Sequence, residues 1–195
     1  MEEVQRAMKE IAEQVSSAID ELDEKQVNDF VQALLKSKRV FVTGVGRSGL
    51  VVKAFAMRLM HLNKDVYVVG ETITPSIHED DILVAVSGSG ETSLTVSAAT
   101  IAKKIGAKLA AVTSYPRSSL GRISDLVVVL PGRVKTESST DFVKRELAGE
   151  YAPVAPLGTL FEVTALTFLD SVISSLMVAL GKNEEDLLAR HATIE

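Results

Sequence analysis

Cysteine is absent from this 195-residue chain, and proline occurs only five times. Without cysteine the chain forms no disulfide, no thiolate nucleophile and no cysteine-ligated metal site. Disulfides are rare in the cytoplasm, and the absence of cysteine fits the cytoplasmic location that we expect. The scarcity of proline and the lack of low-complexity tracts indicate a folded globular protein.

The chain also lacks an excess of positive charge, because 21 basic residues stand against 26 acidic ones and give a net charge of −5. Binding to nucleic acid generally requires a basic surface, so we expect no nucleic-acid partner. The total charge does not exclude a small anionic ligand, because a local binding site is set by geometry.

Long hydrophobic runs are limited to residues 157–180. This run contains Glu162 and Asp170, and two carboxylates inside a membrane span are costly. We therefore expect a helix that is buried in a core or a subunit interface, and no membrane partner. The first residues of the chain are acidic and lack the pattern of a secretion signal.

Two amphipathic helices are predicted ahead of the first strand. Apolar residues recur at steps of three and four over residues 4–22, and again over residues 27–35. The segment is acidic, which makes a DNA-reading helix pair a poor interpretation. We expect residues 1–38 to pack on the core or on a neighbouring subunit, and residues 39–195 to form the main domain of one structural unit.

From residue 39 onward, apolar strand patterns alternate with helical patterns. The predicted strands are residues 39–43, 66–69, 82–86, 109–112 and 126–130, and the predicted helices are residues 50–62, 92–105, 118–122 and a long one from 159. Strands that are apolar throughout are buried on both faces. The pattern predicts an α/β fold, a flavodoxin-like three-layer sandwich around a five-stranded parallel sheet. Residues 133–155 are predicted to form a loop or irregular helix over the site.

The segment from Val84 to Thr92 has the character of an anion-binding loop. An apolar strand runs into Ser87-Gly88-Ser89-Gly90, and a helix rich in serine and threonine follows. Glycines allow a close backbone approach, and the N–H groups of a helix N-terminus favour an anion. A capped helix after a tight turn is the alternative, but two serines alternating with two glycines exceed what a cap needs.

A second glycine-rich loop, residues 44–49, follows the first strand and matches the G-x-G-x-x-G pattern of dinucleotide-binding proteins. Glu71 lies at about the distance where that pattern places a ribose-binding acid. The chain has little room for a separate substrate domain, and the Ser-Gly loop already supplies a phosphate site. We therefore expect no dinucleotide cofactor.

Together the two loops resemble the sugar isomerase (SIS) domain, in which Gly-x-Gly-x-Ser follows one strand and Ser-x-Ser-Gly-x-Thr follows another. The chain is further similar to the 6-phospho-3-hexuloisomerase family in Pro156-Leu157-Gly158-Thr159-Leu160-Phe161-Glu162 and in its final six residues. The resemblance implies a homo-oligomer (tetramer or dimer) that interconverts D-arabino-3-hexulose 6-phosphate and fructose 6-phosphate through a cis-enediol. It also implies that the enzyme needs no cofactor and no metal.

The same resemblance assigns contacts with the substrate and its phosphate to the two loops; these residues are Gly46, Arg47, Ser48, Ser87, Gly88, Ser89 and Thr92. Arg47 is expected to hold the phosphate or a sugar hydroxyl, although it could only pair with a surface acid. Glu91 would repel a phosphate, so we expect it to face sugar hydroxyls or solvent. Alternatives are isomerases of arabinose 5-phosphate or phosphoheptose, and a non-catalytic sugar-phosphate sensor.

Moving a carbonyl between adjacent carbons requires a base for a carbon-bound proton and groups that shuttle hydroxyl protons. Glu162 is the predicted base, since it lies in the first turn of an apolar helix and burial favours proton uptake by a carboxylate. The alternative is a capping box in which Glu162 reaches back to Thr159.

Histidines are scarce in this chain, and two of the three are candidates for proton transfer. His61 ends the helix that begins near Ser48, about 20 Å away at 1.5 Å per residue, so we expect it to act in a neighbouring subunit's site. A favourable interaction with the helix dipole is its simpler role. His191 lies in the charged tail, as a site residue or as solvated surface, and His78 is expected to be exposed.

Overall fold

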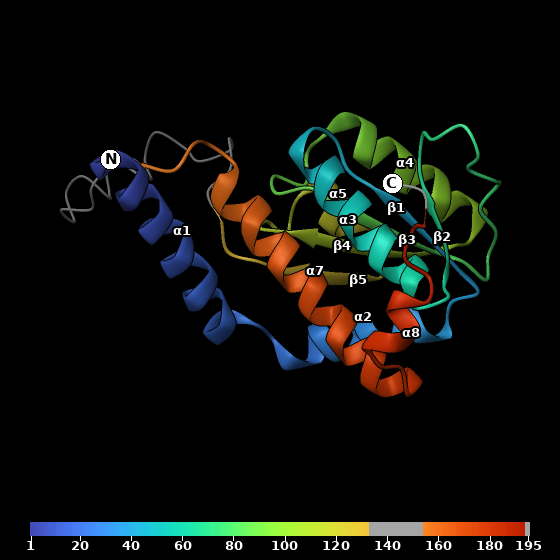
Figure 1. Ribbon diagram of the computed structural model, residues 1–195. Helices are drawn as coiled ribbons and strands as arrows, with labels where there is room; N and C mark the ends of the chain where they lie inside the picture. Colours follow the sequence, from blue (N-terminus) through green and yellow to red (C-terminus); the bar gives the residue numbers. More distant parts are fainter. Residues whose placement is uncertain (133–153, 194–195) are drawn as a thin grey trace.

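A computed structural model describes residues 1–132 and 154–193 (Figure 1). Its sheet has five parallel strands in the order β2-β1-β3-β4-β5. The strands are β1 (Arg39–Thr43), β2 (Asp65–Val68), β3 (Ile82–Val86), β4 (Lys108–Thr113) and β5 (Leu126–Val129). The predicted parallel sheet is confirmed, with strand ends shifted by one residue at most. The predicted structure over residues 133–155 falls almost entirely outside the described residues.

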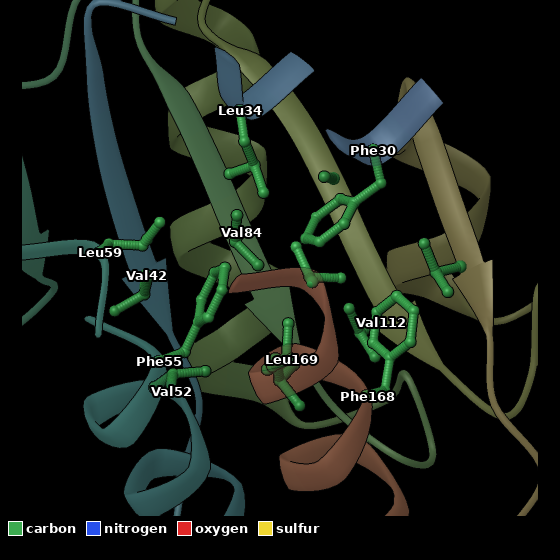
Figure 2. Close-up of a cluster of buried hydrophobic side chains, with 14 of the residues drawn as sticks. Phe30, Leu34, Val42, Val52, Phe55, Leu59, Val84, Val112, Phe168 and Leu169 are labelled. Atoms are coloured by element: carbon green, nitrogen blue, oxygen red, sulfur yellow. The ribbon is translucent and has the colours of Figure 1, made fainter. Parts of the chain in front are cut away.

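Helices cover both faces of the sheet, which confirms the three-layer sandwich (Figure 1). One face carries α2 (Glu24–Lys36), α3 (Arg47–His61) and α7 (Thr159–Leu180), and the other carries α4 (Ser93–Ile105) and α5 (Ser119–Ile123). Figure 2 shows the first interface, where side chains of α2, α3 and α7 meet Val42, Val84 and Val112 of the sheet. The alternating strand residues, such as Phe41 and Leu83, pack toward α4.

The N-terminal helix α1 (Glu2–Glu21) lies alongside α7 (Figure 1), whereas α2 packs on β5 and α7. Val4, Met8 and Ile19 of α1 stay exposed. Helix α7 has the length and composition to cross a membrane, and 39% of its most apolar stretch is buried. Its buried side chains, among them Phe161 and Leu169, belong to the core below the sheet, so in this fold α7 is a core helix.

The strand order places a topological switch point between β1 and β3. The chain leaves β1 for α3 on one face, and leaves β3 for α4 on the other. At such a point two loops diverge from adjacent strand ends and leave a crevice in which ligands of open α/β sheets bind. The two glycine-rich loops of this chain are these loops.

Candidate functional site

The loop after β3 is held in shape by its own hydroxyl groups. Ser87 is 3% exposed, and its Oγ accepts a hydrogen bond from the Gly90 N–H (3.2 Å) and lies 3.1 Å from Oγ1 of Thr92. Thr92 is the N-cap residue of α4, but it makes no side-chain capping bond. The N–H groups of the first turn of α4 therefore lack an intrahelical partner and stay available to an anion.

Helix α5 and its N-cap Ser118 support this loop from behind, a contact that sequence patterns do not show. Gly90 has φ +64°, and a Cβ placed there would lie 1.9 Å from Ser118 Oγ. The Glu91 carboxylate accepts the Ser119 N–H at 2.8 Å, and hydrogen bonding to Ser119 lowers the pKa of Glu91. Glu91 is exposed, so the prediction that it faces sugar hydroxyls or solvent is confirmed for solvent, and its carboxylate also ties the loop to α5.

Gly90→Ala is expected to destabilise the protein more than Gly181→Ala. Both glycines have φ near +60°, but only at Gly90 does a Cβ meet another residue. Strain alone should cost about 1 kcal/mol, and the clash with Ser118 should raise the loss to about 3 kcal/mol. Urea unfolding checks this difference, and phosphate titration should show weaker binding for Gly90→Ala only. Equal losses of stability would contradict the close packing of Gly90 on Ser118.

The loop after β1 brings the backbone of its strand and its helix close together. A Cβ at Gly44 would lie 2.8 Å from the carbonyl oxygen of Ser48, and Gly46 is the N-cap of α3 with φ +62°. The N–H groups of the first turn of α3 have no intrahelical partner, as in any helix. Gly46 has no side chain that could cap them. The N-termini of α3 and α4, with Ser48, Ser87 and Thr92, thus follow the carboxyl ends of the adjacent strands β1 and β3.

Glu162 reaches this end of the sheet from α7. Its carboxylate forms an ion pair with the guanidinium group of Arg47, and Arg47 is the first residue of α3. The Glu162 side chain is 15% exposed and that of Arg47 is 60% exposed. The capping-box alternative is wrong, because α7 is capped by Gly158 without a side-chain hydrogen bond and Glu162 comes one position too late. The ion pair therefore joins Glu162 to the N-terminus of α3, which directly follows the glycine-rich loop after β1.

His61 and His191 form a pair at the opposite end of α3. Their rings stack with centroids 5.4 Å apart and 27° between planes. Both line a cavity of about 660 Å³ between α3, α7 and α8 (Glu184–Leu188). The 15 residues of α3 separate this pair from Arg47 by about 21 Å. As expected, His61 does not reach the loop of its own chain.

The imidazole of His61 is 3% exposed, whereas His78 is exposed as expected and lies beside Ser76. Burial lowers the pKa of His61 below the ordinary 6.5, and the charges of His191, Arg58 and Arg190 lower that pKa further. The neutral ring is therefore favoured at neutral pH. A neutral imidazole can both accept and donate a proton.

Two further observations concern cofactors. Within residues 1–132 and 154–193, no three histidine, aspartate or glutamate side chains are grouped so as to hold a metal ion. Glu71, which a dinucleotide would need for its ribose, is paired with Lys53 at 2.6 Å.

The serine- and threonine-rich start of α4 also contains a hydroxyl that is buried in the core. Thr95 is fully buried in the stripe of α4 that continues with Ala99 and Ala102, and its Oγ1 has no partner among the described residues.

Comparison with known proteins gives a consistent result. The SIS domain profile matches residues 33–144. The 3-hexulose-6-phosphate isomerase of Bacillus subtilis is 37% identical over 95% of this chain and 96% of its own length. An uncharacterized protein of Aeropyrum pernix is 51% identical over 97% of this chain and 92% of its own. A crystal structure from Methanococcus jannaschii, with an inferred function of 3-hexulose-6-phosphate isomerase, covers 100% of both chains with TM-score 0.78 and 31% identity.

Proposed function

Because this chain belongs to the SIS domain family, we propose that it interconverts D-arabino-3-hexulose 6-phosphate and fructose 6-phosphate. The observation that carries the proposal is the position of Glu162, a largely buried carboxylate paired with the first residue of α3, next to the glycine-rich loop after β1. The match with the Bacillus subtilis isomerase over 95% of this chain supports the choice of substrate. Both sugars are ketoses, so the reaction moves the carbonyl between C2 and C3.

The phosphate group is proposed to bind between the N-termini of α3 and α4. Backbone N–H groups there supply donors with the positive end of a helix dipole behind them. The hydroxyls and the close-approaching glycines would complete the site; the residues are Gly46, Ser48, Ser87, Gly88, Ser89 and Thr92. Ser87 and Ser89 both accept N–H bonds within their own loop, so the half-buried Ser48 has the freer hydroxyl.

Arg47 is proposed to change partner when substrate binds. In the free protein it pairs with Glu162, and its side chain is exposed enough to swing toward a phosphate. A dianionic phosphate at the helix N-termini competes for the guanidinium. When the Arg47 guanidinium moves to the phosphate, the Glu162 carboxylate is left unpaired next to the sugar. Glu162 then removes the C3 proton of fructose 6-phosphate, a cis-enediol forms, and a proton returned to C2 gives the 3-hexulose.

His61 and His191 are proposed to move the hydroxyl protons and assist ring opening in a neighbouring subunit. Leu50 and Met57 lie one above the other on the outer face of α3 and are exposed. Burying them against a second α3 in antiparallel orientation brings the His61 end of one helix to the Arg47 end of the other. The cavity beside the histidine pair gives access to the rings. We therefore propose a homo-oligomer, a dimer or tetramer, in the cytoplasm.

A substrate panel with EDTA present tests this function. Fructose 6-phosphate, ribulose 5-phosphate and sedoheptulose 7-phosphate are each incubated with the purified protein and followed by ¹³C NMR. The proposal expects a 3-hexulose 6-phosphate from the first sugar and no turnover of the others. Aldose formation from ribulose 5-phosphate or sedoheptulose 7-phosphate would favour the other SIS isomerases, and binding without turnover would favour a sensor. Loss of activity in EDTA would contradict metal independence.

A further inference from the structure

The C-terminal residues 183–193 close over the end of α3 at which His61 lies, and Figure 1 shows α8 beside that end. Arg190 Nε donates a hydrogen bond to the carbonyl oxygen of Met60 at 3.0 Å, one residue before His61. The next residue, His191, stacks on the His61 ring. The segment therefore contacts both the backbone and the side chain of this turn of α3.

The segment is itself anchored at its beginning. Asn183 and Asp186 form a reciprocal capping box at the start of α8, and Lys182 Nζ lies 3.0 Å from the Asp186 carboxylate. Leu187 packs against the core between the helices and the sheet. A short helix fixed in this way limits where Arg190 and His191 can lie.

His61 lacks the hydrogen bond that usually orients an imidazole. Its Nδ1 is buried and has no partner among the described residues. In most functional histidines a bond to one ring nitrogen fixes the tautomer and the ring rotation. The ring of His191, which stacks on the His61 ring and lines the same cavity, is in position to restrict the rotation of that ring.

The charged groups around His61 come from four parts of the chain. Arg58 belongs to α3, Arg190 and His191 to the tail, Asp170 to α7, and Glu184 and Glu185 to α8. Burial is the largest cause of the lowered pKa of His61, followed by the charge of His191. Removing the His191 side chain would reduce both the burial of His61 and the charge beside it, so the pKa of His61 would rise.

We infer that residues 183–193 act as a strap that holds the His61 ring for proton transfer, with His191 as a positioning residue. This inference rests on the proposed function and divides the roles of the two histidines. His61 exchanges protons with the substrate hydroxyls, and His191 acts through it. A neutral, fixed ring can accept a hydroxyl proton and return it without a change in its surroundings.

Three variants of the full-length protein test the strap: His191→Ala, His191→Phe and the control His78→Ala. His61 is titrated by NMR of isotope-labelled histidine, and kcat/KM is measured against pH. For His191→Ala we expect a roughly tenfold to hundredfold loss of kcat at neutral pH, the scale of a misplaced catalytic group. The pKa of His61 should rise, and the acid limb of kcat/KM should move to higher pH. His191→Phe keeps a stacked ring and should recover most of kcat, and His78→Ala should match the wild type.

An unchanged His61 titration in His191→Ala would overturn the inference. So would a His191→Phe variant as impaired as His191→Ala with an unaltered His61 titration, because His191 would then contact substrate itself. If His191→Ala fails to fold by circular dichroism, Arg190→Ala replaces it with kcat as the readout, because it removes the bond to Met60 while loss of the Arg190 charge by itself raises the pKa of His61. The NMR titration needs no substrate. Failure of the proposed function, seen as an inactive wild type, is thus distinguishable from failure of the strap.

Discussion

Glu162→Gln will lower kcat by about a thousandfold, within the range for loss of a general base. The amide has the shape of the carboxylate but cannot accept the carbon-bound proton. Binding of fructose 6-phosphate should be as tight as in the wild type or tighter, because the helix N-termini and loops that hold the phosphate are unchanged and Arg47 no longer has to leave a carboxylate. Steady-state kinetics and calorimetric titration give the two quantities.

Glu71→Gln is the matched control for this variant. Glu71 also pairs with a basic residue of α3, Lys53, and both side chains are about half exposed. Its kcat should equal that of the wild type. If Glu162→Gln retains normal turnover, Glu162 is not the base and the site must be reassigned.

Mixing two inactive variants will restore activity if His61 serves the neighbouring subunit's site. One variant is Glu162→Gln and the other is His61→Gln, each expected to be at least a hundredfold impaired. After subunit exchange, a mixed dimer has one site with both native groups and one with neither. Random pairing of equal amounts then recovers about a quarter of wild-type activity.

The reverse result is equally clear. If Glu162 and His61 of the same chain share a site, every mixed species stays inactive and no activity returns. Size-exclusion chromatography with light scattering checks that both variants keep the wild-type oligomeric state, and a doubly labelled mixture checks that subunits exchange. A monomer under assay conditions would also contradict the shared site.

The fold was predictable because its determinants are local and periodic. The apolar β-branched runs and the two glycine-rich loops each lie within a few residues, and so does Gly106, which ends α4 in a left-handed conformation. The alternation of strands and helices then predicts a parallel sheet. The sheet order places the two loops on adjacent strands β1 and β3.

The contacts within the candidate site were less predictable, since they join residues distant in sequence. The sequence around Glu162 matches a capping box, but in the structure the Glu162 carboxylate pairs with Arg47, which lies 115 positions earlier. Glu91 is bound by the backbone of Ser119, which the sequence shows only as part of a helical turn. The stacking of His191 on His61 depends on how α8 folds back. Periodicity carries no information about such pairs.

The most direct test of the central claim is proton exchange with solvent. Fructose 6-phosphate is incubated with the wild-type protein in deuterated water containing EDTA, and the recovered sugar is examined by NMR. We predict deuterium at C3 and formation of a 3-hexulose 6-phosphate with the wild type, and neither with Glu162→Gln. Deuterium at C1 with an aldose product, or no exchange at all, would contradict this prediction.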